Sequence, residues 1–193
     1  MGDACGLAGI WASWYDGRRK HLMAISSKPT KDPVKFVYRF KFSNGEKKEF
    51  QILLDDQTLD MIQKPKAQYP AWTRLDNNQC ENCPLNVGEH PRCPVAEKMV
   101  DVAEIFKDRV SSDSVELEIE TGARKYTRRL PLSDGVSAMI GIFFATGGCP
   151  IMNRLKPMVR THLPFATLEE TLYRMLAMYM LGQYFQVKRG REP

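Results

Sequence analysis

Hydrophobic and polar side chains alternate strictly along residues 34–42. The apolar face carries Val34, Phe36, Tyr38, Phe40 and Phe42. A period of two is typical of a strand with one buried face. Asn44-Gly45 follows, and this pair can supply the two positive-φ residues of a type I′ turn. The pattern therefore predicts a β-hairpin, with a return strand that carries Phe50, Ile52 and Leu54.

A second alternating stretch predicts another hairpin, in which residues 115–120 pair with residues 126–132. Glutamates at every second position place one face of its first strand in solvent, and Gly122 marks the turn. Two hairpins can join into one antiparallel sheet, with helices packed on one face. We therefore expect an α+β fold with this architecture.

Helical spacing of apolar residues predicts four helices. The first is a short helix before Pro65, capped by Asp55 or Asp56, and the others span residues 94–109, 136–145 and 168–185. Ser133 or Asp134 should cap the third helix. Thr167-Leu168-Glu169-Glu170 has the form of a capping box. The last helix is apolar over most of its circumference, so it should be buried or form a homodimer with a second copy.

The 193-residue length fits a single domain, which we place at residues 34–193 after a flexible N-terminal extension, residues 1–33. No apolar run approaches the eighteen or so residues of a membrane helix. The chain opens without the basic and apolar regions of a secretory signal, and we expect a cytoplasmic protein. The net charge of +5 is spread along the chain, which disfavours a nucleic-acid partner.

Four cysteines suggest a metal centre within this domain. Cys80, Cys83 and Cys93 fall within fourteen residues, and Cys149 follows much later. In a reducing compartment, cysteines at such spacing more often bind metal than form disulfides. The alternative is that they are inert, packed thiols. We expect these four sulfurs to ligate one metal centre, and we leave Cys5 out of it.

The residues after the cysteines bear on the choice between an iron–sulfur cluster and Zn²⁺. Proline follows Cys83, Cys93 and Cys149. Zinc knuckles commonly need positive φ after the second cysteine, which Pro84 excludes because its ring holds φ near −65°. Cys-Pro also closes the bacterial ferredoxin motif. The pattern favours a [4Fe–4S] cluster with a redox or sensing role, and the alternative is structural zinc in a protein-interaction module.

A basic segment follows Cys149. Arg154, Lys156, Arg160 and His162 could face an anionic ligand, a protein partner or a redox partner. The alternative is a solvated loop that neutralises nearby acidic groups. The sequence assembles no nucleophile with its base and no phosphate-binding motif, so we lean against an enzyme. An enzyme would use an anionic-substrate groove next to Cys149.

Several short motifs resemble a family of bacterial proteins of unassigned function. They are Cys80-x2-Cys83-Pro-Leu, Gly148-Cys149-Pro, Leu155-Lys156-Pro157-Met158, His162-Leu163-Pro164-Phe165 and Glu169-Glu170-Thr171. The resemblance covers about residues 34–186. It implies that the cysteines belong together, and it brings no activity, cofactor or catalytic residue.

Overall fold

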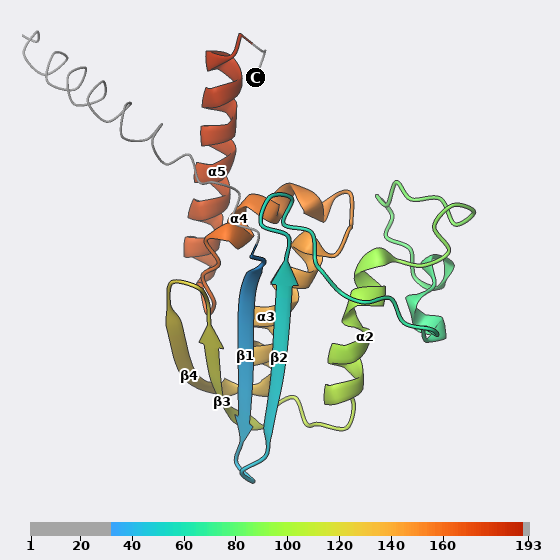
Figure 1. The fold of residues 1–193 in the computed structure, drawn as a ribbon, viewed down its shortest axis with the longest axis vertical. Helices are drawn as coiled ribbons and strands as arrows, with labels where there is room; N and C mark the ends of the chain where they lie inside the picture. The colour runs from blue at the N-terminus through green and yellow to red at the C-terminus, as the bar shows by residue number, and fades with distance from the viewer. Residues whose placement is uncertain (1–31, 191–193) are drawn as a thin grey trace, which may run out of the picture. The chain divides into compact units, whose positions relative to one another are not determined.

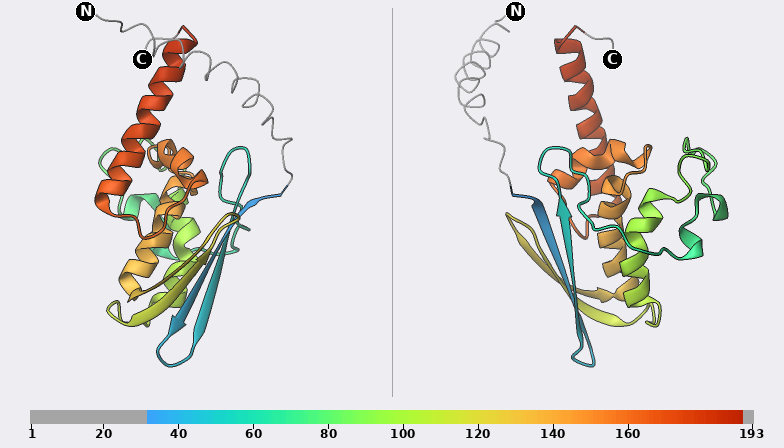
Figure 2. Two further views of the ribbon diagram at one scale, coloured as in Figure 1. Left: turned by 90° about the vertical axis from the view of Figure 1, so that its left-hand side faces the viewer. Right: turned by 45° about the vertical axis from the view of Figure 1, so that its right-hand side comes forward.

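The computed structural model describes residues 32–190, in which one antiparallel sheet carries helices on one face (Figure 1 and Figure 2). The strands are β1 (Val34–Phe42), β2 (Lys47–Leu54), β3 (Ser114–Glu120) and β4 (Lys125–Pro131). Their order is β2-β1-β3-β4, so the two hairpins join through β1 and β3. The predicted α+β class and the joined hairpins are confirmed. Residues 1–31 of the predicted N-terminal extension lie outside the described residues.

The helices divide into a group that covers the sheet and a long final helix that extends beyond it (Figure 2). The α-helices are α2 (Pro94–Phe106), α3 (Leu132–Thr146), α4 (Lys156–Arg160) and α5 (Leu168–Lys188). Short 3-10 helices are η1 (Ala71–Thr73), η2 (Leu75–Asn77) and η3 (Met152–Leu155). No described helix is long and apolar enough to cross a membrane.

The core lies between the apolar face of the sheet and helices α2 and α3. Phe106 of α2 places its ring 5.1 Å from that of Phe40 and 5.3 Å from that of Phe50. Met139 of α3 is fully buried against the same face. Gly135 permits this close approach, because a Cβ there would lie 2.9 Å from Cε1 of Phe40. The alternating pattern of the strands thus predicts the buried face correctly.

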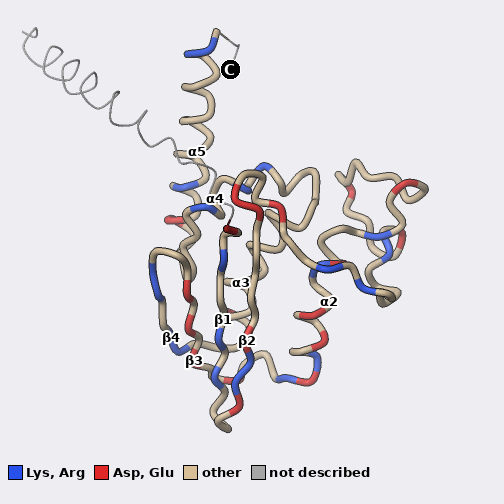
Figure 3. Tube along the Cα trace, in the orientation of Figure 1, with Lys and Arg blue, Asp and Glu red and all other residues tan. Residues whose placement is uncertain are grey.

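The opposite face of the sheet carries an ion-pair network, and Figure 3 shows the charged positions along the strands. Arg39 lies at its centre and contacts carboxylates on both neighbouring strands: Glu49 at 2.8 Å, Glu118 at 2.8 Å and Glu120 at 2.7 Å. Opposite charges on neighbouring strands favour the register that the buried face already sets.

Two local predictions are wrong. In the first hairpin, the Gly45 N–H donates to the Phe42 carbonyl (3.0 Å), and Gly45 has φ +84°. Asn44 does not have the positive φ that a type I′ turn requires, so the loop is a turn closed by one left-handed glycine. The expected caps of α3 are also absent: Pro131 occupies the N-cap position, without a side-chain hydrogen bond.

The short helix expected before Pro65 does not form either. Asp55 accepts hydrogen bonds from the backbone N–H groups of Gln57 (2.9 Å) and Thr58 (2.7 Å). Leu59 then adopts φ +57°, which interrupts a right-handed helix, while its side chain is buried in the core. Burial of Leu59 therefore prevails over the local tendency of a capped apolar segment to form a helix.

Candidate functional site

The segment that carries the first three cysteines is a long loop anchored at its two ends. Its two ends pair through an isolated bridge between Arg74 and Arg92. The Cys93 N–H donates to the Thr73 carbonyl at 2.8 Å. Thr73 is fully buried, and its hydroxyl accepts a hydrogen bond from Arg92 at 2.9 Å. These contacts hold Cys93 beside η1, at the start of α2 (Figure 1).

Cys80 and Cys83 share one tight turn within this loop. The Cys83 N–H donates to the Cys80 carbonyl at 3.0 Å. The Cys80 thiol is exposed and the Cys83 thiol is half-buried, and both are free. Most residues between Asp76 and Pro91 are exposed, so this turn has little apolar packing of its own.

The two glycines before the late cysteine pack against the residues that follow the third one. If Gly148 carried a Cβ, that atom would lie 3.3 Å from Cβ of Pro94, and one on Gly147 would lie 3.4 Å from Cα of Val95. Gly148 has φ +99°, a conformation that favours glycine. The chain entering Cys149 therefore packs directly against the residues that follow Cys93, although 55 residues separate the two cysteines.

The four thiols do not meet at one point in the structure. Among residues 32–190, no three or more His, Cys, Asp or Glu side chains lie close enough to hold a metal ion. The structure thus places Cys93 and Cys149 on adjoining segments and Cys80 and Cys83 in one turn. Whether all four bind one metal stays a prediction.

The basic residues after Cys149 point in different directions. Lys156 pairs with Asp60 at 2.5 Å, and this hydrogen bond is the main cause of the lowered pKa of Asp60. Arg160 pairs with Asp56 at 3.5 Å. Arg154 is exposed and has no ion pair within the described part of the chain. Two of the predicted anion-binding cations therefore tie α4 to the turn after β2, and anion binding by this group stays a prediction.

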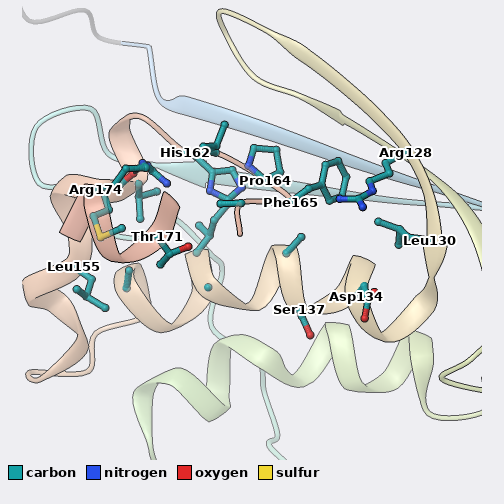
Figure 4. A pocket seen from close by; sticks show the side chains of 18 of the residues that line it. Arg128, Leu130, Asp134, Ser137, Leu155, His162, Pro164, Phe165, Thr171 and Arg174 are labelled. Carbon is teal, nitrogen blue, oxygen red and sulfur yellow. The ribbon is translucent and has the colours of Figure 1, made fainter. Parts of the chain in front are cut away.

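His162 faces inward instead, onto a pocket of about 690 Å³ (Figure 4). The pocket lies between β4, α3, α4 and the start of α5. Nε2 of His162 lies 2.6 Å from the Tyr38 hydroxyl, which also lies 3.2 Å from the Ala138 carbonyl. The hydroxyl has one proton, so it donates to one of these acceptors, and the tautomer of His162 determines which.

Burial keeps this pair uncharged. Desolvation, followed by the nearby Arg174 cation, lowers the pKa of His162 to about 4. Desolvation alone raises the pKa of Tyr38 above its usual range. At neutral pH the pair is therefore a neutral hydrogen-bonded unit, and His162 is its member that lines the pocket. The sequence offered no signal for it, because Tyr38 reads as one more apolar position of an alternating strand.

A family model described as a domain of unknown function (DUF6901) matches residues 36–193. The resemblance to a family of unassigned function is thereby confirmed, and the family description names no activity. The chain matches no protein of curated function and no solved structure.

Proposed function

We propose that this protein, which belongs to that family of unknown function, is a cytoplasmic metal-binding protein with a four-cysteine site. Its ligands are Cys80, Cys83, Cys93 and Cys149. The proposed cofactor is a [4Fe–4S] cluster, which would exchange electrons with a redox partner or sense the redox state. Thiolates are the usual ligands of such clusters, and a reducing compartment keeps them available.

One observation carries the proposal: the contact between the two Cys-Pro segments. Pro94 packs against the backbone of Gly148, so Cys93 and Cys149 each adjoin the same contact. In a chain of this length, nothing in the local sequence requires two such distant thiols to lie on adjoining segments. The exposed Cys80–Cys83 turn has few apolar contacts to hold it, and its movement would bring the other two thiols to the site.

Structural zinc is the second candidate, and the exposure of residues 76–91 favours it. A loop that buries few apolar side chains can be ordered by a metal that crosslinks it. The free energy of metal binding then stabilises the folded loop. In that case the protein is an interaction module, and the metal holds the loop against α2 and the end of α3.

Anaerobic purification, visible absorption and analysis for iron, labile sulfide and zinc test the proposal. We expect a coloured protein that contains iron and sulfide in similar amounts. A colourless protein with one equivalent of zinc favours the second candidate. Cys93→Ser and Cys149→Ser should each lose the metal, whereas Cys5→Ser should retain it. Retention of metal by both Cys93→Ser and Cys149→Ser would rule out the four-cysteine site.

We also propose that α5 pairs with a second copy of itself. Ten large apolar side chains of α5 are between 43% and 75% exposed, and the helix buries no residue of its own. Its first turn carries Glu169 and Glu170, its end carries Lys188 and Arg189, and residues 175–187 have no charge. Antiparallel pairing therefore places acidic ends against basic ends along a helix of about 31 Å.

Analytical ultracentrifugation tests this homodimer. Leu176→Glu with Met180→Glu should give a monomer, because the charges fall in the middle of the apolar surface. Lys188→Glu should weaken the dimer, and adding Glu169→Lys to the same chain should restore it if the helices are antiparallel. A wild-type monomer at high concentration would refute the pairing.

A further inference from the structure

The pocket beside His162 is a cavity of ligand size whose charges are unbalanced. Three arginines line it, Arg128, Arg129 and Arg174, against one described acidic residue, Asp134. None of the three arginines has an ion pair among residues 32–190, and His162 is neutral. A volume of about 690 Å³ lies in the usual range for small-molecule sites.

The three arginines differ in how many hydrogen bonds their guanidinium groups already donate to other residues. Arg174 donates to the carbonyls of Met158 (3.0 Å) and Thr161 (2.6 Å), which ties α5 to α4. Arg129 donates to the Ser114 hydroxyl at 3.2 Å. The Arg128 side chain has no hydrogen bond within the described residues, and its guanidinium lies over the ring of Phe165 at 5.8 Å. Arg128 is therefore the cation best placed to receive an anion.

The remainder of the wall is mainly apolar. Figure 4 shows Arg128, Phe165 and Leu130 toward one end of the pocket and Arg174 and Leu155 toward the other. Between them lies α3, whose small residues Gly141 and Ala138 line the pocket. A Cβ at Gly141 would meet no atom within 4 Å.

We propose that this pocket binds a carboxylate with an elongated apolar chain, whose anionic head contacts Arg128 and whose chain lies along α3. The guanidinium supplies two parallel donors that match a carboxylate. The aliphatic wall supplies affinity that grows with chain length, by about fourfold per buried methylene. Arg128 has its donors free before binding, so the head displaces no protein partner.

Calorimetric titration of the full chain with decanoate tests the proposal, with octanoate, decylamine and acetate as comparison ligands. We expect one saturable site for decanoate and an affinity for octanoate, which has two methylenes fewer, about 16-fold lower. Decylamine, which has the same chain and the opposite charge, should show no saturable binding, and acetate should not bind measurably. Similar affinities for decanoate and decylamine would overturn the proposal, because the charge would then play no part.

Two pairs of variants locate the site. Arg128→Gln should weaken decanoate binding by about 10- to 100-fold, the usual range for a lost charge-assisted hydrogen bond. Arg124→Gln removes the same charge from the same hairpin outside the pocket and should have no effect. Gly141→Leu should abolish binding by filling the space over α3, without a clash at Cβ. Gly182→Leu, on α5, is its control.

Exposed apolar residues of α5 are a competing site for any amphipathic ligand. The variant Leu176→Glu with Met180→Glu should therefore bind decanoate as the wild type does. Unchanged binding by Gly141→Leu, or lost binding by the α5 variant, would place the ligand outside the pocket and refute the proposal.

Discussion

Helices α3 and α5 are the two longest in the described structure, both are rich in apolar side chains, and their surroundings are opposite. Helix α3 packs against both the sheet and α2 and buries seven residues, among them Met139 and Ile142. Helix α5 contacts α4 over its first part and buries none. Apolar composition therefore predicts that a helix needs a partner, but not whether that partner lies within the same chain.

A matched pair of methionines should show the largest difference between the two helices. Met139 is fully buried and Met180 is 64% exposed. Met139→Ala should lower the free energy of unfolding by about 2–5 kcal/mol, because it leaves a cavity. Met180→Ala should change it by less than about 0.5 kcal/mol. Urea denaturation at low protein concentration measures both, and equal effects would contradict the comparison.

His162, at the junction between the two regions, should make stability depend on pH. An unfolded chain binds its proton below about pH 6.5, whereas the folded chain binds it only below about pH 4. The free energy of unfolding should therefore fall as pH drops from 6.5 to 4, by on the order of 3 kcal/mol, and this slope should end below pH 4.

The comparison of His162→Gln with His90→Gln isolates that effect, because carboxylates also titrate in acid. His90 is exposed in the cysteine loop. His162→Gln should flatten the pH dependence between pH 4 and 6.5, and His90→Gln should leave it as in the wild type. An unchanged slope in His162→Gln would show that the imidazole is not desolvated.

Substitution of two glycines of α3 by alanine should change stability in opposite directions, because one glycine is closely packed and the other is not. A Cβ at Gly135 would lie 2.9 Å from Phe40 and 3.1 Å from Leu130, whereas one at Gly141 meets nothing within 4 Å. Gly135→Ala should therefore destabilise the protein by about 1–3 kcal/mol through overpacking. Gly141→Ala should stabilise it by about 0.5–1 kcal/mol. Thermal denaturation that shifts both variants in one direction would contradict this assignment.

The first residues of α5 and α3 should also respond differently to substitution, although the effect on stability should be smaller. The Thr167 hydroxyl accepts from the Glu170 N–H (3.1 Å), and Glu170 accepts from the Thr167 N–H (2.7 Å). Thr167→Ala should weaken α5 by about 1 kcal/mol, because α5 depends on its own cap. Ser133→Ala should change α3 by less than about 0.5 kcal/mol. Amide hydrogen exchange within each helix measures the difference.

Much of the fold was predictable from local pattern. The two hairpins follow from alternation, and the capping box at Thr167 is confirmed. The errors occur where local preference competes with packing: Leu59 is drawn into the core and turns left-handed, and α3 begins at Leu132, directly after β4. Turn and cap signals are worth about 1 kcal/mol or less, so burial of one large side chain can override them.

The candidate site was predictable only in part. The cysteine spacing identified which thiols to examine, yet their distances depend on how the exposed loop before α2 lies against the end of α3. The pocket was missed because its lining comes from β4, α3, η3, α4, α5 and the segment before α5. His162, which lines it, contacts a strand residue, Tyr38, 124 residues earlier in the chain.

Side-chain periodicity was sufficient to establish the strands, most helices and the buried face of the sheet, because each depends on neighbours a few residues away. The contact between Pro94 and Gly148, the neutral state of His162 and the exposure of α5 follow from the three-dimensional arrangement alone. Each of these depends on which distant segments exclude water from one another, and that is settled only when the whole chain packs.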